Sequence, residues 1–310
     1  MRAVVFAYSN VGDRCLRVLR ARGVEVPLVV THRDQAGEAI WFRRVADTAE
    51  ELGLPLRYGD DVSDPALRAA VAAAQPDLLF SFYFRSLLPD AILALAARGA
   101  FNMHGSLLPR YRGRAPTNWA VLHGDSETGA TLHEMVARAD AGRIVDQQAV
   151  PILPDDTAGE VFDKVTVAAE QVLWRALPAI VSGRVEYRTN DLARGSYFGA
   201  RRPEDGRIDW SQPAGRVYDL IRAVAPPYPG AFTEVAGVRV VVAAARRLAA
   251  PPLSRVDSAP GLHVVDGRIV ALCGDGGAIS IRELRVAGAP LGADALNTLL
   301  QTQRAGDLPR

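Results

Sequence analysis

The fold is decided by residues 2–32, RAVVFAYSNVGDRCLRVLRARGVEVPLVVTH, in which two apolar runs flank a segment with helical spacing. Residues 2–8 and 26–32 read as buried strands because their apolar residues are nearly continuous. Residues 12–23 carry apolar side chains three and four positions apart, which is typical of an amphipathic helix. A strand, a helix and a second strand in this order predict a right-handed crossover between parallel strands.

The same alternation continues through the first half of the chain. Further strands are expected at 77–84, 99–104 and 129–136, and further helices at 38–53, 64–75, 89–99 and 154–183. Asp156 or Thr157 can cap the start of the last helix, and Gly183 can end it. The predicted fold class is therefore α/β, with a doubly wound, mainly parallel, Rossmann-like sheet whose ligands bind beyond the carboxyl ends of the strands.

The pattern changes in the last third of the chain. Residues from about 190 are polar and glycine-bearing, which suits a linker, and one helix is expected at 214–225. The short runs GAFTEV, VRVVVAAARRL, GLHVVD, RIVALCG and AISIREL then read as closely spaced strands separated by turns. They predict a smaller, OB-like β-barrel. We expect a catalytic domain at 1–189, a linker at 190–203 and a β-barrel domain at 204–310.

Composition limits the class of protein. The chain has 310 residues, 49% of them hydrophobic, and 36 basic against 35 acidic residues give a net charge of +1. This balance does not favour a nucleic-acid binder, although nearly all basic residues are arginine. The sequence offers neither a signal peptide nor a membrane-spanning apolar run, so no membrane partner is expected. Cys15 and Cys273 are too few for a disulfide framework, and we expect a cytoplasmic protein.

Several common chemistries find no motif here. The turn YSNVGD after the first strand has neither GxGxxG nor GxxxxGK[ST], so NAD and ATP are not expected as ligands. HExxH, CxxC and GxSxG are also absent from the sequence, which removes support for a bound metal and for a serine nucleophile. The glycine-rich stretch GDGG at 274–277 lies between two strand-like runs and reads as a hairpin turn.

What remains is FNMH, residues 101–104, at the end of an expected strand. Residues two apart in a strand point to the same face, so Asn102 and His104 project together. An amide can stabilise a developing oxyanion and an imidazole can carry a proton, which is a minimal kit for acyl transfer. Asp140, in the later loop RADAG, could support the imidazole. The alternative is that His104 has a purely structural role. His133 and the remaining histidines show no comparable polar companion, so for them we expect surface or packing roles.

The longer stretch FNMHGSLLPRYRGRAPTNWAVLHGDSETGATLHEMVARADAGRIV closely resembles the signature of the 10-formyltetrahydrofolate-dependent formyltransferases. Within that family the chain resembles the formyltransferase domain of the bifunctional polymyxin-resistance enzyme, which acts on UDP-4-amino-4-deoxy-L-arabinose. The resemblance extends to FSFYFRSLL, YFGARRPEDGRIDW and RAVAPPYPGAF. The other branch, methionyl-tRNA formyltransferase, would carry a lysine-rich insertion where this chain reads THRDQAGEAIWFRR. No decarboxylase motif is found, so we expect a freestanding formyltransferase.

The resemblance implies a folate-dependent enzyme that needs neither metal nor NAD. It implies 10-formyltetrahydrofolate as co-substrate, a nucleotide-linked amino sugar as acceptor, and Asn102, His104 and Asp140 as catalytic residues. The folate-binding residues that it implies are Ser86, Leu87, Leu88, Arg114, Val136, Ala137, Arg138, Ala139 and Asp140. For the diphosphate of the sugar nucleotide, the candidates are Arg110, Arg112, Arg201 and Arg202. The alternatives are tRNA formylation and a folate- or nucleotide-sugar-binding module without catalysis.

Overall fold

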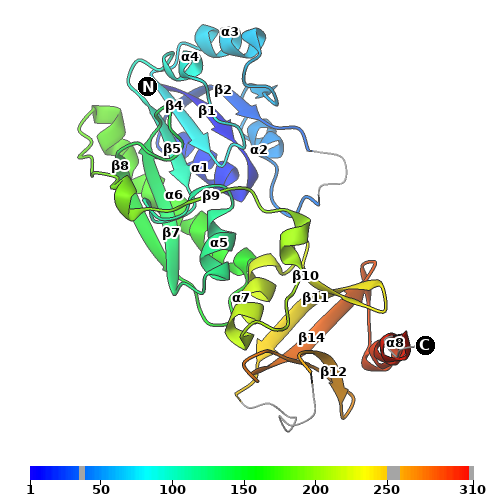
Figure 1. Cartoon of the computed structure of the whole chain (residues 1–310). Coiled ribbons are helices and arrows are strands. Elements are labelled where there is room, and N and C mark those ends of the chain that lie inside the picture. The colour runs from blue at the N-terminus through cyan, green and yellow to red at the C-terminus, as the bar shows by residue number, and fades with distance from the viewer. Residues whose placement is uncertain (35–38, 250–258, 307–310) are drawn as a thin grey trace. The chain divides into compact units, whose positions relative to one another are not determined.

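The structure is a computed structural model that describes residues 1–34, 39–249 and 259–306 (Figure 1). The helices are α1 (Ser9–Ala21), α2 (Val45–Glu51), α3 (Pro65–Ala73), α4 (Asp90–Leu93), α5 (Pro116–Leu122), α6 (Ala158–Ser182), α7 (Ala214–Val224) and α8 (Ala293–Gly306), with 3-10 turns η1 (Leu192–Arg194) and η2 (Pro203–Gly206). The strands are β1 (Arg2–Ala7), β2 (Glu25–Thr31), β3 (Leu56–Tyr58), β4 (Leu78–Phe82), β5 (Ala100–His104), β6 (Arg112–Gly113), β7 (Glu127–Glu134), β8 (Ile144–Pro151), β9 (Tyr197–Phe198), β10 (Ala231–Val235), β11 (Val238–Arg247), β12 (Gly261–Val265), β13 (Arg268–Leu272), β14 (Ala278–Val286) and β15 (Ala289–Pro290).

The chain divides into two compact units, each built from more than one segment. Unit 1 comprises Met1–Pro116, Glu127–Pro151 and Phe162–Ala200, and unit 2 comprises Thr117–Ser126, Ile152–Val161 and Arg201–Arg310. Residues 190–200, in the segment where the sequence suggests a linker, thus belong to unit 1. The two units are described separately below.

Unit 1 contains a seven-stranded sheet in the order β3-β2-β1-β4-β5-β7-β8. The pairs from β3 to β5 are parallel, whereas β7 is antiparallel to both β5 and β8. The chain steps outward in one direction from β1 to β3 and then returns to β4 on the other side of β1. This is the doubly wound arrangement, so the predicted fold class is confirmed.

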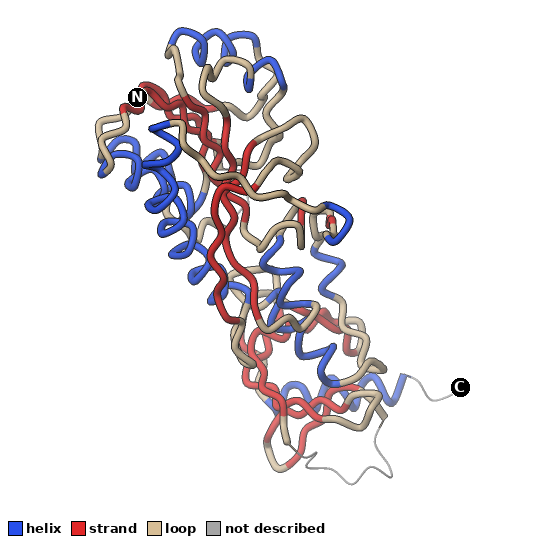
Figure 2. The backbone as a smooth tube through the Cα atoms, turned by 90° about the vertical axis from the view of Figure 1, so that its left-hand side faces the viewer, coloured by secondary structure: helices blue, strands red, loops and turns tan. Residues whose placement is uncertain are grey.

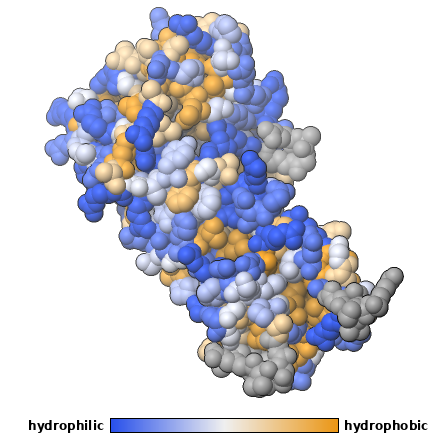
Figure 3. All heavy atoms as spheres, in the orientation of Figure 1, coloured by the Kyte–Doolittle hydropathy of each residue, from blue (hydrophilic) through white to orange (hydrophobic). Residues whose placement is uncertain are grey.

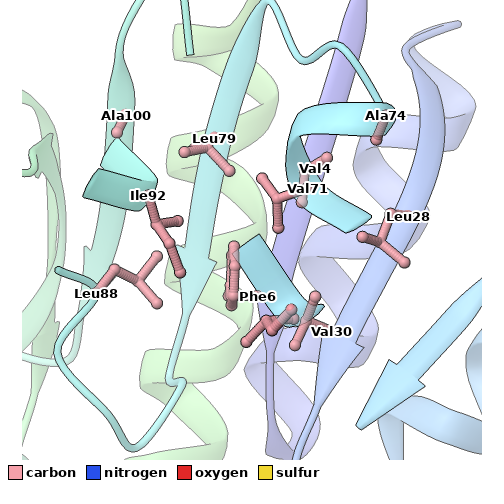
Figure 4. Packing of buried hydrophobic residues seen from close by; sticks show 11 residues of the cluster. Val4, Phe6, Leu28, Val30, Val71, Ala74, Leu79, Leu88, Ile92 and Ala100 are labelled. Carbon is pink, nitrogen blue, oxygen red and sulfur yellow. The ribbon is translucent and has the colours of Figure 1, made fainter. Parts of the chain in front are cut away.

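One face of this sheet is covered by α3 and α4. Figure 4 shows side chains from four neighbouring parallel strands and from these helices meeting in one cluster. Its buried members are Val4, Phe6, Leu28, Val30, Leu67, Val71, Ala74, Leu79, Leu88, Ile92 and Ala100. Phe84 and Met135, which follow β4 and β7, pack against the cluster and are partly buried. Burial of this apolar surface fixes the strand ends from which the loops of the site emerge.

The opposite face is covered by α1 and α6, and Figure 2 shows helices on both sides of the strands of this sheet. These two helices are linked by Arg14, which pairs with Glu170 at 2.8 Å, and by Arg22, which stacks over Trp174 at 3.7 Å. The capping prediction for the long helix holds at both ends. Thr157 exchanges hydrogen bonds with Glu160, and Gly183 adopts φ +71° at the C-terminus.

Some predicted helices are shorter than expected. The helix predicted at 38–53 begins at Val45, while its first residue, Glu38, lies outside the described residues. Trp41 contacts Phe162 and Phe42 contacts Tyr8, so their apolar character serves tertiary packing from a loop. The helix predicted at 89–99 ends at Leu93 and continues as turns. Local spacing cannot distinguish a helix face from loop aromatics that pack on distant elements.

Several elements were not predicted from the sequence, among them β3, α5, β8 and α8. β8 is the edge strand of the sheet and most of its side chains are only partly buried, so it shows little apolar alternation. α8 follows the last strands and contributes one fully buried side chain, Leu296. Elements with so few buried residues carry a weak periodic signal.

Unit 2 contains a six-stranded antiparallel sheet in the order β10-β11-β14-β13-β12, with β15 paired to β14. Register shifts between Val242 and Ala245 bend β11, so that the sheet curls into an open half-barrel. α7 packs against β11, and α8 contacts both edge strands, β10 and β12. GDGG forms the predicted turn, in which Cys273 N–H donates to Gly277 O. A small C-terminal β-barrel-like unit is therefore confirmed.

No helix within the described ranges is long and apolar enough to cross a membrane. The face shown in Figure 3 mixes hydrophilic and hydrophobic residues over both units. Such interspersed polarity is ordinary for the surface of a folded domain.

Candidate active site

The end of β5 presents the two residues singled out from the sequence. β5 lies between β4 and β7, and in its register with β7 Asn102 is opposite His133 while His104 is opposite Thr131. Phe101 and Met103 point to the other face of the strand and are almost fully buried, with 2% and 1% exposure. The apolar pair thus anchors the strand, and Asn102 and His104 share one face as predicted.

His104 is 6% exposed and both of its ring nitrogens face oxygen atoms. Nε2 lies 2.8 Å from the backbone oxygen of Tyr111 and must donate to it, because a carbonyl only accepts. Nδ1 lies 3.5 Å from Oδ1 of Asp140, which is longer than a normal hydrogen bond. The Tyr111 carbonyl therefore fixes the orientation of the ring, and Nδ1 is the position at which a second proton would face the carboxylate.

Asn102 is positioned by His133. Nδ1 of His133 lies 2.7 Å from Glu134 O, so this nitrogen carries the proton of the neutral ring. Nε2 of His133 can then accept from the amide nitrogen of Asn102, at 3.1 Å. The same amide nitrogen lies 3.4 Å from Oδ1 of Asp140, a long and weak contact. One amide hydrogen is thus committed to His133, and the other makes only the long contact with Asp140, which a ligand oxygen can replace.

Asp140 joins the two histidines. Its Oδ1 lies 3.5 Å from His104 and 3.4 Å from His133, and its Oδ2 accepts from the backbone N–H of Gly113 at 2.8 Å. Burial by itself raises the pKa of this carboxyl group, but the charge on His104 and the Gly113 hydrogen bond lower it and outweigh burial. The net pKa of Asp140 lies well below its usual range, so the group is ionised near neutral pH.

The short strand β6 supports this cluster with one edge of its backbone. On one side, Arg112 N–H donates to Ser196 O and Arg114 N–H to Phe198 O, which ties the strand to β9. The groups on the other side are Tyr111 O, which accepts from His104, and Gly113 N–H, which donates to Asp140. A single two-residue strand therefore sets the positions of both the imidazole and the carboxylate.

Backbone conformation at this cluster is unusual. Tyr111 has φ +57° and Asp140 has φ +50°, in the left-handed region that non-glycine residues seldom adopt. Such conformations cost about 1–3 kcal/mol each and concentrate at functional sites. Asn190 holds the Asp140 turn, since its amide donates to Asp140 O at 2.9 Å and to Gly142 O at 3.0 Å.

The SLLP turn that follows His104 is held by buried hydroxyl groups. Ser106 donates to Arg110 O at 2.6 Å, and Thr131 donates to Ser106 O at 2.6 Å. Thr131 also accepts from Leu108 N–H at 3.1 Å. These bonds close the loop so that Tyr111 returns to His104, which explains the serine and the tight turn in the sequence.

The residues expected to bind folate lie on the loops after β4, β6 and β7. Leu88 is buried in the cluster under α4, whereas Leu87 is 71% exposed, and Val136, in the loop after β7, is 47% exposed. Arg114 donates to Arg85 O at 2.8 Å and so joins the loop after β6 to the one after β4. Ser86 is half-buried, and Ala137 and Arg138 are exposed.

The four arginines suggested for the diphosphate have different environments. Arg110 is exposed and stacks over Tyr111 at 5.5 Å, while Arg112 is buried. Arg201 and Arg202 belong to unit 2, where Arg201 donates to Asp205 O at 3.0 Å and the Arg202 N–H donates to the Asp205 carboxylate at 2.7 Å. Their part in binding remains a prediction.

The sequence did not identify every residue of the cluster. The expectation that His133 lacks a polar companion is wrong, because it contacts both Asn102 and Asp140. Pairing FNMH with ATLHEM as antiparallel strands would have placed it opposite Asn102. Gly113, Tyr111 and Asn190 act through backbone groups or on backbone groups, and residue type alone gives no signal for that.

The fold and this cluster are those of an α/β transferase, and comparison with known proteins agrees. The profile of a family described as "Formyl transferase" matches residues 1–177, and that of "Formyl transferase, C-terminal domain" matches residues 201–297. The chain belongs to the formyl transferase family. It is a formyltransferase enzyme.

Solved structures of similar fold include sugar-modifying enzymes. An N-formyltransferase from Helicobacter canadensis, in complex with folinic acid and dTDP-3-aminofucose, has a TM-score of 0.70 and 17% identity over 90% of this chain and 98% of that one. HypX from Aquifex aeolicus, in complex with tetrahydrofolic acid, has a TM-score of 0.65 and 18% identity over 97% of this chain and 47% of that one. A sugar N-formyltransferase from Shewanella has a TM-score of 0.62 and 19% identity over 78% and 96%.

Proposed function

We propose that the enzyme transfers the formyl group of 10-formyltetrahydrofolate to the primary amine of a nucleotide-linked amino sugar. The observation that carries the proposal is the cluster at the end of β5 in a formyltransferase chain, in which Asp140 lies 3.4 Å from Asn102 and 3.5 Å from His104. UDP-4-amino-4-deoxy-L-arabinose is the specific acceptor that the sequence resemblance suggests. The Helicobacter canadensis structure, with its dTDP-linked amino sugar, supports the broader class of acceptor.

The folate would lie against the loops after β4 and β7. Leu87 and Val136 expose apolar side chains there, which suits the flat rings of the co-substrate. The backbone around Ser86 and the turn before Asp140 can supply the donors and acceptors that a pterin needs. Arg114 would stay near both, because it is tied to Arg85 O. In this arrangement the formyl carbon would face Asn102 and His104.

Side chains of the protein would lower the barrier to formyl transfer through hydrogen-bond donors that are held in place before the reaction. The acceptor amine adds to the formyl carbon, and the carbon–N10 bond then breaks as one proton passes from the amine to N10. The second amide hydrogen of Asn102 and a proton on Nδ1 of His104 would stabilise the oxyanion that forms in between. Ionised Asp140 faces that proton at 3.5 Å and balances its charge. Removal of one oxyanion donor typically lowers kcat by about 10²–10³.

The test is a side-by-side assay with 10-formyltetrahydrofolate and four acceptors. These are UDP-4-amino-4-deoxy-L-arabinose, a dTDP-linked 4-amino sugar, a dTDP-linked 3-amino sugar and initiator methionyl-tRNA. We expect turnover with a sugar nucleotide, abolished in His104→Ala and Asp140→Ala variants that keep the wild-type circular dichroism spectrum. Turnover with the tRNA alone would replace the proposed acceptor. Binding of folate and sugar nucleotide without turnover would indicate a non-catalytic module.

A further inference from the structure

Arg112 is a buried cation for which the described part of the chain supplies no counter-charge. The residue is 6% exposed, and its Nε is completely buried without a hydrogen-bond partner. Among the described residues, its side chain has no hydrogen bond, carboxylate or aromatic ring as a partner, and only its backbone N–H is used, toward Ser196 O. A guanidinium group carries five donors and is charged at every physiological pH. Its burial without an acceptor is costly unless something else supplies one.

A second arginine buried to the same degree shows how a buried guanidinium is otherwise paired in this protein. Arg222, also 6% exposed, likewise has a buried Nε without a partner, but its other two nitrogens donate to Asp156 O at 2.7 Å and to the Asp219 carboxylate at 2.6 Å. Arg201, which is partly buried, donates to Asp205 O at 3.0 Å. The absence of a partner at Arg112 is therefore a property of this position and not of arginines in this chain.

The position of Arg112 relates it to the reacting groups. Its two neighbours in sequence, Tyr111 and Gly113, contact His104 and Asp140 through their backbone atoms. The residue is also fixed by the β6–β9 pairing, so its backbone cannot drift from the cluster. A ligand group that meets the guanidinium would be held at a constant distance from the imidazole and the carboxylate.

We propose that Arg112 binds an oxyanion of one of the two co-substrates. This inference rests on the proposed function. A planar guanidinium pairs with phosphate or carboxylate through two parallel hydrogen bonds, which suits either the diphosphate of a sugar nucleotide or the glutamate carboxylate of the folate. Among the four arginines suggested by the sequence, Arg112 is the one whose guanidinium is buried without a partner in the described residues, so its burial is balanced only when the ligand is bound.

The experiment compares Arg112→Met and Arg112→Lys with the wild type, and uses Arg68→Met on the exposed surface of α3 as the control. Calorimetric titrations with UDP, dTDP, inorganic pyrophosphate and 5-formyltetrahydrofolate separate the two sources of the oxyanion. We expect Arg112→Met to weaken binding of either the phosphate ligands or the folate by about tenfold to a hundredfold, and to leave the other within twofold. Arg112→Lys keeps the positive charge but not the planar pair of donors, so its affinity should lie between those of the wild type and Arg112→Met.

Thermal unfolding without ligand gives an independent readout. Because methionine removes an uncompensated buried charge, the melting temperature of Arg112→Met should equal or exceed that of Arg68→Met. A clearly lower melting temperature would show that the fold itself needs the guanidinium, and would overturn the proposal. Unchanged affinity for every ligand would overturn it as well. If the wild type binds neither nucleotide nor folate, the proposed function fails. The role of Arg112 is then tested with pyrophosphate alone. Weaker pyrophosphate binding by Arg112→Met than by the wild type supports that role, and equal binding refutes it.

Discussion

Replacement of Gly113 by alanine should separate β6 from β9. It should thereby shift the backbone groups of β6 that hold His104 and Asp140. A β-carbon added at Gly113 would lie 2.2 Å from the backbone oxygen of Phe198 and 3.2 Å from the ring of Tyr197. The residue also has φ +97°, a conformation that is strained for any side chain. A backbone oxygen cannot rotate away as a flexible side chain could, so the strand itself must move.

The cost can be estimated from these contacts. The left-handed conformation alone costs alanine about 1–3 kcal/mol. Loss of the Gly113 N–H bond to the Asp140 carboxylate, 2.8 Å long, removes a charge-assisted hydrogen bond of about 1.5–3 kcal/mol. Each kcal/mol lowers the melting temperature of a domain of this size by about 2–4 °C. A displacement of the reacting groups by about 1 Å can lower turnover by about a hundredfold.

The assay measures kcat/KM for formyl transfer and the melting temperature of the same preparations. Gly199→Ala is the matched control, because it follows β9 directly and a β-carbon added there meets nothing within 4 Å. We expect a fall of about two orders of magnitude in kcat/KM for Gly113→Ala and little change for Gly199→Ala. Equal activity and equal melting temperatures in the two variants would show that the β6 edge does not position His104 and Asp140.

Three further predictions concern single groups. Asp140→Asn should be less stable to urea than the wild type above about pH 4, which is the pKa of an unfolded aspartate. This difference in stability should vanish as the pH falls through the lower pKa of folded Asp140. A difference independent of pH would contradict this assignment. His133→Phe removes the acceptor that orients Asn102, so kcat should fall about tenfold to a hundredfold with the KM for folate little changed, and His133→Gln should retain more activity. Burial raises the pKa of Cys15, and burial together with the charge of Asp275 raises the pKa of Cys273 to about 11. Neither thiol should therefore react with a disulfide reagent at pH 8 until the protein is unfolded. Rapid labelling of the native protein would refute this.

Much of unit 1 could be predicted from its sequence because its parallel strands are buried on both faces. Such strands read as continuous apolar runs, as in residues 2–8 and 77–84, and the helices between them keep a clear periodicity. The helix predicted from residue 38 failed at its start because Trp41 and Phe42 pack from a loop onto distant rings. Edge elements such as β8 bury too little to leave a pattern.

The candidate catalytic residues could be singled out for a different reason. Asn102 and His104 stand two apart at the end of a recognisable strand, and Asp140 was proposed as the partner of the imidazole and also matched a family signature. The partners of these residues could not be read in the same way. Tyr111 and Gly113 use backbone atoms, and the role of His133 depends on the register between β5 and β7. Register and backbone contacts depend on the folded chain and not on residue type.

The pairing of β6 with β9 has a practical consequence for dividing this protein. A fragment that ends at residue 189 would retain Asn102, His104 and Asp140, yet it would lack Asn190, which holds the Asp140 turn, and the strand that braces Gly113. Such a fragment should fold its main sheet and still be a poor catalyst. Extension by eleven residues to Ala200, the end of unit 1, would restore both supports. Where the chain is cut thus matters as much as which side chains remain.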